Sequence, residues 1–348
     1  MSFTIFTLDV GSGTQDFLLF KPGENVRNMP KAVLPSPTRI VAHKIRQAKG
    51  DIFLKGYTMG GGENKKAVKE KVSSGGKVYA TEKAALSFAD NIDAVRKLGV
   101  IVTESPDEAD LEVIETKDVD LKLFSTLLSS IGEEMPERLI IAVQDHGFSP
   151  DESNRVFRFR KFRERLESEP FLHSFLYSQE EIPECYNRML SVVESINDYG
   201  EKKGIDFDVN VIDTVFAAIS GAMMDAKEFP ALIINYGNGH TVGAIVDRDG
   251  EVFGLFEHHT SVIRRNGKEW FDRLIGRFVR GELTNEEVFE SGGHGAVILK
   301  AVDVKDFVAT GPNTSLSDFR EANPAGDVMV VGNLGMVSLY ARKYGGYG

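Results

Sequence analysis

Two short glycine-containing segments carry the residue types best suited to chemistry. Asp9–Gln15 and Asn235–Thr241 each place a Gly-x-Gly turn after an apolar run. Backbone N–H groups at such turns can surround an anion, and glycine permits both positive φ and close approach. The glycines expected to adopt positive φ are Gly11, Gly13, Gly237 and Gly239. The sequence therefore indicates two phosphate-binding hairpins, with an ordinary tight turn as the alternative for either one alone.

Side chains around these glycines suit a magnesium phosphate. Hydroxyl groups of Ser12, Thr14 and Thr241 can donate to phosphate oxygens, and Asp9 at a strand end can hold the water shell of Mg²⁺. We therefore expect Asp9 to be the metal-facing residue.

Histidines form a second group, beside glycines, acids or predicted strand ends: His146, His240, His258, His259 and His294. Glu257 beside two imidazoles could orient a water, donate to a phosphate or bind a transition metal. Neighbouring residues of a strand point to opposite faces, so only one of His258 and His259 is expected to reach any single ligand. A metal site, hydrogen bonding to phosphate or substrate, and a structural role all stay open.

A third motif, Gly60, Gly61 and Gly62, opens a charged helix that contains Lys65 and Lys66. Free N–H groups at a helix start could hold an anionic substrate. It is not a Walker loop, because Gly-Lys-Ser/Thr is absent. A flexible surface loop is the alternative.

Two similar sets of elements must position these motifs. The first begins with a hairpin of strands at 3–8 and 16–20, followed by a buried strand at 139–143. The second has strands at 231–235, 241–247, 251–257, 306–310 and 328–331, with a helix around Trp270 and a closing helix over 336–344. Three antiparallel strands and then alternating helices and strands is the ribonuclease-H-like order. The repeated hairpin suggests a duplicated half-domain.

One basic stretch, from Arg155 to Arg165, invites a nucleic-acid interpretation. Glu164, Glu167 and Glu169 follow at once, so we interpret it as a solvated helix face.

These motifs, in this order, resemble the actin/Hsp70/sugar-kinase ATPase superfamily. Asp9–Gln15 is similar to its first phosphate motif and Asn235–Thr241 to its second. Asp213 opens a segment similar to the first connecting helix, Phe307–Asn313 resembles the adenosine motif, and Gly332–Ala341 the closing helix. The resemblance implies an α/β fold of two ribonuclease-H-like (actin-like ATPase) domains. Each would be a mixed five-stranded sheet flanked by helices, with a nucleotide cleft between them. The first would span 1–228 plus 333–348 with insertions, and the second 229–332.

The resemblance also implies Mg²⁺ with ATP as ligands. Nucleotide-binding residues would be Gly11, Ser12, Gly13, Thr14, Gln15, Asn235, Gly237, Asn238, Gly239, His240, Thr241, Gly311, Pro312 and Asn313. Catalytic candidates are Asp9, Asp145, Asp213 and Glu257, and substrate candidates are His146, His258, His259 and Gly60–Gly62. The chain would be an ATP hydrolase or a small-molecule phosphotransferase. The alternatives are a nucleotide-dependent, chaperone-like activator of a partner protein and a pseudo-ATPase.

Two departures from the superfamily pattern imply slow turnover. The second motif usually begins with Asp, where this chain has Asn235, and the first usually carries Lys or Arg where Gln15 and Asp16 stand.

Within the superfamily, the chain looks closest to a mainly archaeal family labelled "putative pyruvate formate-lyase activating enzyme". The shared marks are Val143-Gln-Asp-His-Gly, Gly237-Asn-Gly-His-Thr, Glu257-His-His-Thr and Gly311-Pro-Asn. A glycyl-radical activating enzyme needs three cysteines for its iron–sulfur cluster, and Cys185 is the single cysteine here. We therefore expect no cluster and no radical activity.

Composition narrows the classes of partner and cellular location that fit the sequence. The 348 residues carry a net charge of −11, which argues against a nucleic-acid partner. No apolar run approaches the roughly 18 residues of a membrane span, and the first residues lack the basic region of a signal peptide. A cytoplasmic protein without membrane contact is expected.

Overall fold

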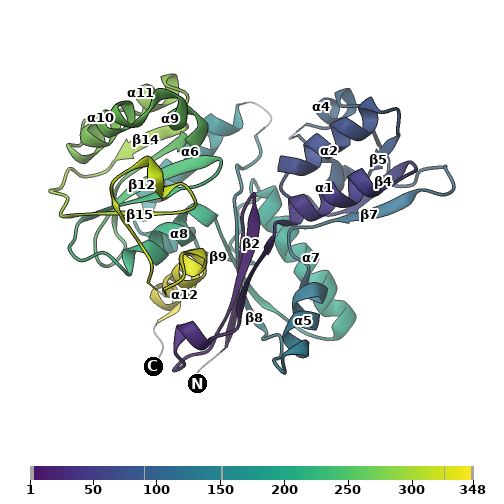
Figure 1. The fold of residues 1–348 in the computed structure, drawn as a ribbon, viewed down its shortest axis with the longest axis horizontal. Helices are drawn as coiled ribbons and strands as arrows, with labels where there is room; N and C mark the ends of the chain where they lie inside the picture. Colours follow the sequence, from purple (N-terminus) through teal and green to yellow (C-terminus); the bar gives the residue numbers. More distant parts are fainter. Residues whose placement is uncertain (1–3, 90, 150–151, 325, 346–348) are drawn as a thin grey trace.

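Three β-sheets and their covering helices make up the computed structural model of the chain, which describes residues 4–89, 91–149, 152–324 and 326–345 (Figure 1). Phe3, expected in the first strand, lies outside the described residues. Two six-stranded sheets carry the predicted hairpins, and a four-stranded sheet forms a separate lobe beside the first of them.

The first six-stranded sheet has the order β3-β2-β1-β8-β10-β9. Strand β1 pairs antiparallel with β2 and parallel with β8, and β8 pairs parallel with β10. The strands span Ile5–Val10 (β1), Thr14–Phe20 (β2), Lys31–Pro35 (β3), Arg138–Val143 (β8), Tyr177–Ser178 (β9) and Asp208–Ile212 (β10). This is the ribonuclease-H-like order with one added edge strand, β9.

The second six-stranded sheet repeats that order as β14-β13-β12-β11-β15-β16. Its strands span Ala231–Tyr236 (β11), His240–Val246 (β12), Val252–His259 (β13), Gly295–Ile298 (β14), Asp306–Thr310 (β15) and Arg320–Glu321 (β16). The added edge strand is β14. The two sheets confirm the predicted fold class, although each has six strands instead of the expected five.

The fifth strand expected at 328–331 is wrong. Val328–Val330 is a 3₁₀ helix, η4, which leads into helix α12 (Val331–Tyr344). A short apolar run does not distinguish a buried strand from a buried helix start, and the neighbouring β2 and α8 offer this run a helix-packing site. The fifth strand is the two-residue β16.

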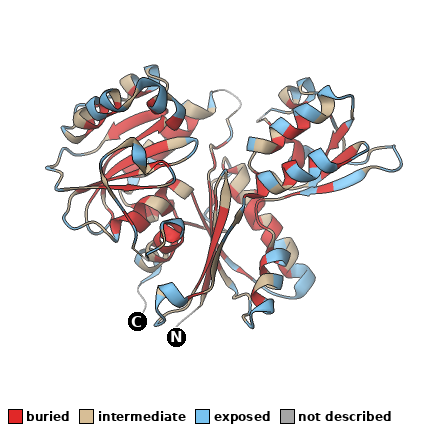
Figure 2. Cartoon of the chain, in the orientation of Figure 1, coloured by how far each residue is buried: buried red, intermediate tan, exposed pale blue. Residues whose placement is uncertain are grey.

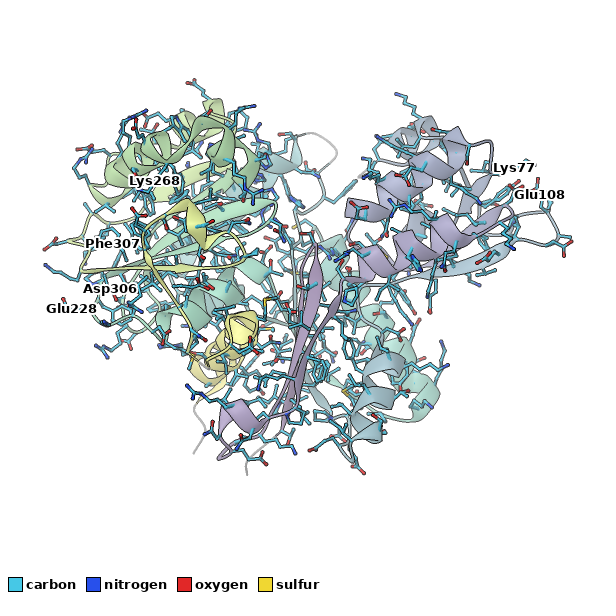
Figure 3. All side chains as sticks on the ribbon, in the orientation of Figure 1. Lys77, Glu108, Glu228, Lys268, Asp306 and Phe307 are labelled. Atoms are coloured by element: carbon cyan, nitrogen blue, oxygen red, sulfur yellow. The ribbon has the colours of Figure 1, made fainter. Side chains whose placement is uncertain are left out.

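The four-stranded parallel sheet follows the first hairpin as an insertion, in the order β6-β5-β4-β7. Its strands span Ile52–Gly56 (β4), Val78–Ala80 (β5), Val100–Val102 (β6) and Glu112–Thr116 (β7). Helices α1 (Pro37–Gln47), α2 (Gly62–Ser73), α3 (Glu82–Ala85) and α4 (Ile92–Lys97) pack with it around its own apolar cluster. Surface ion pairs such as Lys77–Glu108 mark its outer edge (Figure 3).

Buried side chains line the sheets and the helices that face them (Figure 2). Helices α5 (Leu121–Ser130) and α7 (Asn187–Lys203) pack on one side of the first sheet. Helix α6 (Asn154–Ser168) contacts β14, and α9 (Thr260–Asn266), α10 (Lys268–Val279) and α11 (Asn285–Glu290) accompany the second sheet. The remaining 3₁₀ turns are Val26–Asn28 (η1), Leu172–Phe175 (η2) and Thr314–Leu316 (η3).

Helices α8 (Thr214–Met223) and α12 cross between the two six-stranded sheets. Their backbones touch: a Cβ built at Gly221 would lie 1.9 Å from the Val331 carbonyl oxygen, and one at Gly335 equally close to that of Ala217. Only glycine allows this approach, which places the start of α12 beside β1. None of the described helices is long and apolar enough to cross a bilayer.

Candidate functional site

Most of the predicted site residues line one cleft. It encloses about 1560 Å³ of empty space and is partly open to solvent. Both hairpin tips line it, together with Gly60–Gly62, Gly311, Pro312 and the first residues of α12. The two tips approach each other, because a Cβ at Gly13 would lie 3.5 Å from Asn238 Nδ2. Segments more than 200 residues apart in the chain therefore form one site.

The two hairpin turns are built alike. The Gly11 amide donates to the Thr14 carbonyl (2.9 Å), and the Gly237 amide to the His240 carbonyl (3.0 Å). A hydroxyl that follows the third strand then holds each turn: Ser36 Oγ donates to the Ser12 carbonyl, and Thr260 Oγ1 to that of Gly237. The repeated construction supports the duplicated half-domain suggested by the sequence.

The expected positive φ at the hairpin glycines is wrong. Gly11, Gly13, Gly237 and Gly239 are not among the glycines with a left-handed φ. The turns close with ordinary backbone, so any need for glycine there is a need for space. A Cβ at Gly237 would lie 2.7 Å from the His240 carbonyl oxygen, whereas one at Gly239 would meet nothing within 4 Å.

Two carboxylates share the first hairpin. Asp9 and Asp16 are register partners across β1 and β2, and both line the cleft. Burial, with the charges of Asp16 and Asp213, raises the pKa of Asp9 well above its usual range. Burial and Asp327 raise the pKa of Asp16 to about 7, against the lowering effect of Thr14. Asp16 Oδ1 is buried without a hydrogen-bond partner. An oxygen-seeking cation such as Mg²⁺ would satisfy that oxygen and relieve the repulsion, so these residues fit the expected metal.

Asn235 lies on the opposite side of the cleft, in register with Thr310. A Cβ at Gly311 would come within 2.6 Å of Asn235 Oδ1, so glycine is required for this contact. Asn313 is buried and donates to the Gly237 carbonyl (3.0 Å), which ties the predicted adenosine motif to the second hairpin.

Asp213 and Glu257 are paired with an arginine in a buried ion cluster. Arg158, from α6, donates to Asp213 Oδ2 (2.6 Å) and to Glu257 Oε2 (3.0 Å), and all three side chains are almost fully buried. Burial opposes ionisation of Glu257, but Arg158 outweighs it and the pKa falls to about 2. Glu257 ends inside the protein and does not face the cleft as the resemblance implied. The solvated-face interpretation of the Arg155–Arg165 stretch is therefore wrong for Arg158.

The packing of α6 explains that error. Arg158 shares a helix face with Phe162 and Leu166, four and eight residues on, and its guanidinium carbon lies 4.5 Å from the centre of the Phe162 ring. This i, i+4, i+8 stripe was the available signal for a buried arginine.

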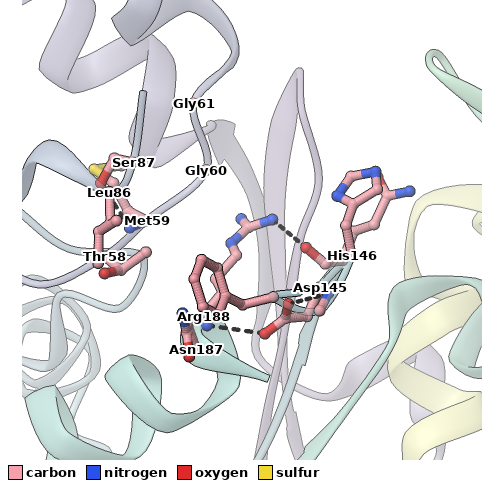
Figure 4. A pocket seen from close by; sticks show the side chains of 13 residues that line it. Thr58, Met59, Gly60, Gly61, Leu86, Ser87, Asp145, His146, Asn187 and Arg188 are labelled. Atoms are coloured by element: carbon pink, nitrogen blue, oxygen red, sulfur yellow. Dashed lines mark hydrogen bonds between the residues drawn. The ribbon is translucent and has the colours of Figure 1, made fainter. Parts of the chain in front are cut away.

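A side pocket of about 640 Å³ adjoins the cleft (Figure 4). The two spaces share Gly60, Gly61, Gln144, His146 and Arg188. Arg188 is held by Asp118 (2.6 and 3.0 Å) and donates to the Gln144 carbonyl. A Cβ at Gly60 would lie 2.9 Å from Arg188 Nη2, so glycine makes room for the guanidinium.

Asp145 lines the side pocket with both oxygens already in use. Oδ1 accepts from the Gly147 amide, and Oδ2 from the amides of Arg188 and Met189 at the start of α7. Its carboxylate thereby anchors the helix that carries Arg188.

Four histidines gather beside the second hairpin. His240, His259 and His294 lie with ring centres 4.8–4.9 Å apart, and His146 lies 5.6 Å from His240. Burial lowers the pKa of each ring, to about 3 for His294. His258 points to the other face, against Trp270 and Ser291, as strand alternation predicts.

Several predicted residues are not among those that line the cleft: Gln15, Asp145, Asp213, Thr241, Glu257, His258, His259 and Asn313. Gln15 donates to the Pro35 carbonyl and Thr241 bonds Thr260, so both support the hairpins from behind. The glycine loop opens helix α2 (Gly62–Ser73) as predicted, but Lys65 and Lys66 do not line the cleft. Sequence reasoning missed Arg188 and Gln144, and it treated Asp16 only as a departure from the superfamily pattern.

Topology and cleft together define a protein of the actin-like ATPase fold. The chain belongs to the family described as "Putative pyruvate format-lyase activating enzyme (DUF1786)", whose model matches residues 59–316. Among curated proteins, no match was found.

Two solved structures are similar to the chain. One is an exopolyphosphatase-like protein, with 10% identity over 89% of this chain and 66% of that one, and a TM-score of 0.32. The other is the ethanolamine utilization protein EutJ from Carboxydothermus hydrogenoformans, with 8% identity over 95% of this chain and 88% of that one, and the same TM-score. The chain thus spans slightly under two thirds of the exopolyphosphatase-like protein. Neither similarity bears on activity.

Proposed function

We propose that the cleft binds Mg-ATP and that the protein transfers the γ-phosphoryl group slowly to water or to a small acceptor. The observation that carries this proposal is the meeting of the two hairpin tips at Gly13 and Asn238, beside the carboxylates Asp9 and Asp16. Exposed N–H groups suit phosphate oxygens, and the carboxylates suit the magnesium ion that accompanies them.

Apolar surface for a nucleobase is available on the same cleft. Pro312, Val328 and Met329 line it, and all three are exposed. Exposed apolar side chains in a cleft gain from covering a flat ring. The base would lie against them while the phosphates reach the hairpins.

The side pocket favours a small-molecule acceptor over a protein partner. It opens beside the phosphate end of the cleft, where Gly60, Gly61 and Arg188 line both spaces. Arg188 is the one permanent cation among the described lining residues, and Asp118 raises its pKa further against the effect of burial. It is suited to hold an anionic group of the acceptor or a phosphate oxygen.

His146 is the neutral base best placed for that acceptor, because it lines both the cleft and the pocket. Burial lowers its pKa well below the usual range, so the ring is uncharged and can accept a hydrogen bond from a hydroxyl. Asp145 acts through α7 by fixing Arg188. Mg²⁺, when bound, neutralises phosphate charge during transfer.

Gly239→Val tests the proposal with little risk to folding. Nothing lies within 4 Å of a Cβ at Gly239, so valine should leave the fold intact and block the approach of a phosphate. Gly50→Val is the matched control, because Gly50 is equally open and lies in the insertion.

We expect Mg-ATP at 100 times its dissociation constant to stabilise the wild type and Gly50→Val by roughly 2.7 kcal/mol in a thermal-shift assay. Gly239→Val should lose this shift while keeping the melting temperature of the free protein. Equal ATP shifts in all three proteins would show that the hairpins are ordinary turns. Phosphate release with and without added alcohols and amines would then separate hydrolysis from transfer.

A further inference from the structure

Three histidines outside the proposed magnesium site lie close enough to share one ion. His240 and His259 are register partners on β12 and β13, and His294 stands immediately before β14. One ring nitrogen from each can be chosen so that all three lie within 4.8 Å of one another. Adjacent strands of one sheet therefore present three imidazoles to a common point.

Among the three histidines, His294 has buried ring nitrogens that lack hydrogen-bond partners. Its side chain is 1% exposed, and the lack concerns both ring nitrogens. A buried imidazole without a partner forfeits the hydrogen bonds that water gave it in the unfolded chain. Its backbone amide bonds the Glu257 carbonyl (2.8 Å), which holds the ring in place.

The surrounding charge favours a cation. Arg158 brings one positive charge against the two carboxylates of Asp213 and Glu257, so the cluster retains one net negative charge in the interior. Glu257 Oε2 lies 3.7 Å from His294 Nδ1. A carboxylate behind a ligating histidine orients the ring and makes it a better donor to a metal.

We propose that His240, His259 and His294 bind a divalent transition-metal ion, with zinc as the first ion to test. Imidazole nitrogen is the ligand type that zinc and its neighbours prefer over magnesium. Tetrahedral nitrogens at about 2.1 Å from zinc lie about 3.4 Å apart, so the ring nitrogens would approach one another by up to about 1.4 Å on binding. The lowered pKa values leave the rings uncharged, which is their metal-binding form.

Three protein ligands leave a fourth position for water or a substrate oxygen. His240 lines the nucleotide cleft, and its backbone carbonyl closes the second hairpin through Gly237. Gln144 contacts Nδ1 of His240 (2.8 Å) and so directs an ion to Nε2. The ion would thus lie beside the phosphate-binding tip, separate from the carboxylate site of Asp9 and Asp16.

The test is zinc binding by the full chain without a histidine tag, in the absence of nucleotide. His259→Ala is the main variant, because His259 is only half-buried and its loss should leave the fold intact. His294→Gln removes the buried ligand and keeps a polar side chain. His43→Ala, an exposed histidine of α1, is the control.

We expect about one zinc ion per chain in the wild type and His43→Ala after dialysis, measured by mass spectrometry of the metal. His259→Ala and His294→Gln should bind zinc at least about tenfold more weakly in a chelator competition. Co²⁺ in place of zinc should give the visible absorption of a tetrahedral site, lost in the same two variants. Equal zinc affinity in all four proteins would overturn the proposal, as would a wild type that binds no zinc.

The expected zinc binding does not depend on whether the hairpins bind ATP. If Gly239→Val shows that the hairpins do not bind nucleotide, zinc binding is still expected, and a failed zinc site leaves the nucleotide experiment unaffected.

Discussion

Asp9 and Asp16 face each other across the first hairpin as register partners, so the cleft carries two carboxylates on one side and the uncharged Asn235 on the other. In the superfamily pattern, a Lys or Arg follows the first glycines and an Asp opens the second motif. The negative charge of this cleft is therefore redistributed onto one hairpin. Under the proposed function, a metal ion would offset the repulsion between these carboxylates and the phosphates.

The Asp9–Asp16 pair predicts a pH-dependent response to magnesium. Asp16 has a pKa of about 7 in the folded protein, above the usual value of about 3.9, so the folded state holds a proton that the unfolded state releases. Stability of the metal-free protein should fall as pH rises from about 4 to about 7. Mg²⁺ needs the ionised carboxylates, so its stabilising effect should grow over the same range.

Thermal unfolding at pH 6 and pH 8, with and without Mg²⁺, measures how the stabilisation by magnesium depends on pH. Asp16→Asn should raise the melting temperature of the metal-free protein at pH 8 and remove most of the magnesium response. Asp107→Asn, an exposed carboxylate in the insertion, is the control. The same magnesium shift at both pH values would contradict the assignment.

Asn235→Asp should tighten Mg²⁺ or raise ATP hydrolysis, because it adds a charge facing Asp9 across the cleft. Each 1.4 kcal/mol gained only in the transition state is tenfold in rate. Asp9→Asn should abolish both magnesium binding and hydrolysis. Steady-state phosphate release titrated with Mg²⁺ checks these expectations, and an unchanged or slower Asn235→Asp enzyme would indicate that another group has replaced the missing carboxylate.

Arg158→Leu should destabilise the protein by more than about 3 kcal/mol, because it strands the buried carboxylates of Asp213 and Glu257. Arg160→Leu on the exposed face of the same helix should cost at most about 1 kcal/mol. Urea unfolding at pH 7 compares the two. A small effect at Arg158 would mean that the carboxylates are not ionised in the folded protein.

The buried cluster of Arg158, Asp213 and Glu257 also predicts that the folded protein loses stability in acid. Glu257 has a pKa lowered to about 2, below the usual value of about 4.3, so its ionised form stabilises the folded state above that usual value. This contribution should disappear progressively as pH falls from about 4.3 to about 2. Glu257→Gln should be less stable than the wild type at pH 7, and the difference should narrow over this acid range.

Cys185→Ser should behave like the wild type in stability and nucleotide binding. The thiol is half-buried, and burial raises its pKa, which makes the reactive thiolate scarce. Anaerobic preparations should contain neither sulfide nor iron in cluster stoichiometry, because one cysteine cannot ligate a cluster. Stoichiometric iron and sulfide would contradict this prediction and reinstate the activity named in the family description.

The sequence by itself predicted what depends on short stretches of chain. Alternating apolar residues around Gly-x-Gly turns define both hairpins, and the order of strands and helices defines the ribonuclease-H-like sheets. The helix that follows the glycine loop and the opposite orientations of His258 and His259 follow from helix and strand periodicity alone. It also showed that a single cysteine cannot hold a cluster.

Tertiary structure alone decided the contacts between distant segments. The charged stretch around Arg158 shows no partner for the guanidinium; folding places it between Glu257 on β13 and Asp213 at the start of α8. Residues 328–331 are helical because β2 and α8 offer them a packing surface. His240, His259 and His294 lie close together because of the β-sheet register and the turn before β14. The order of residues along the chain does not specify the distance between these rings. Short-range sterics and periodicity act along the chain, whereas charge pairing and metal ligation depend on separations in space that only the folded sheets set.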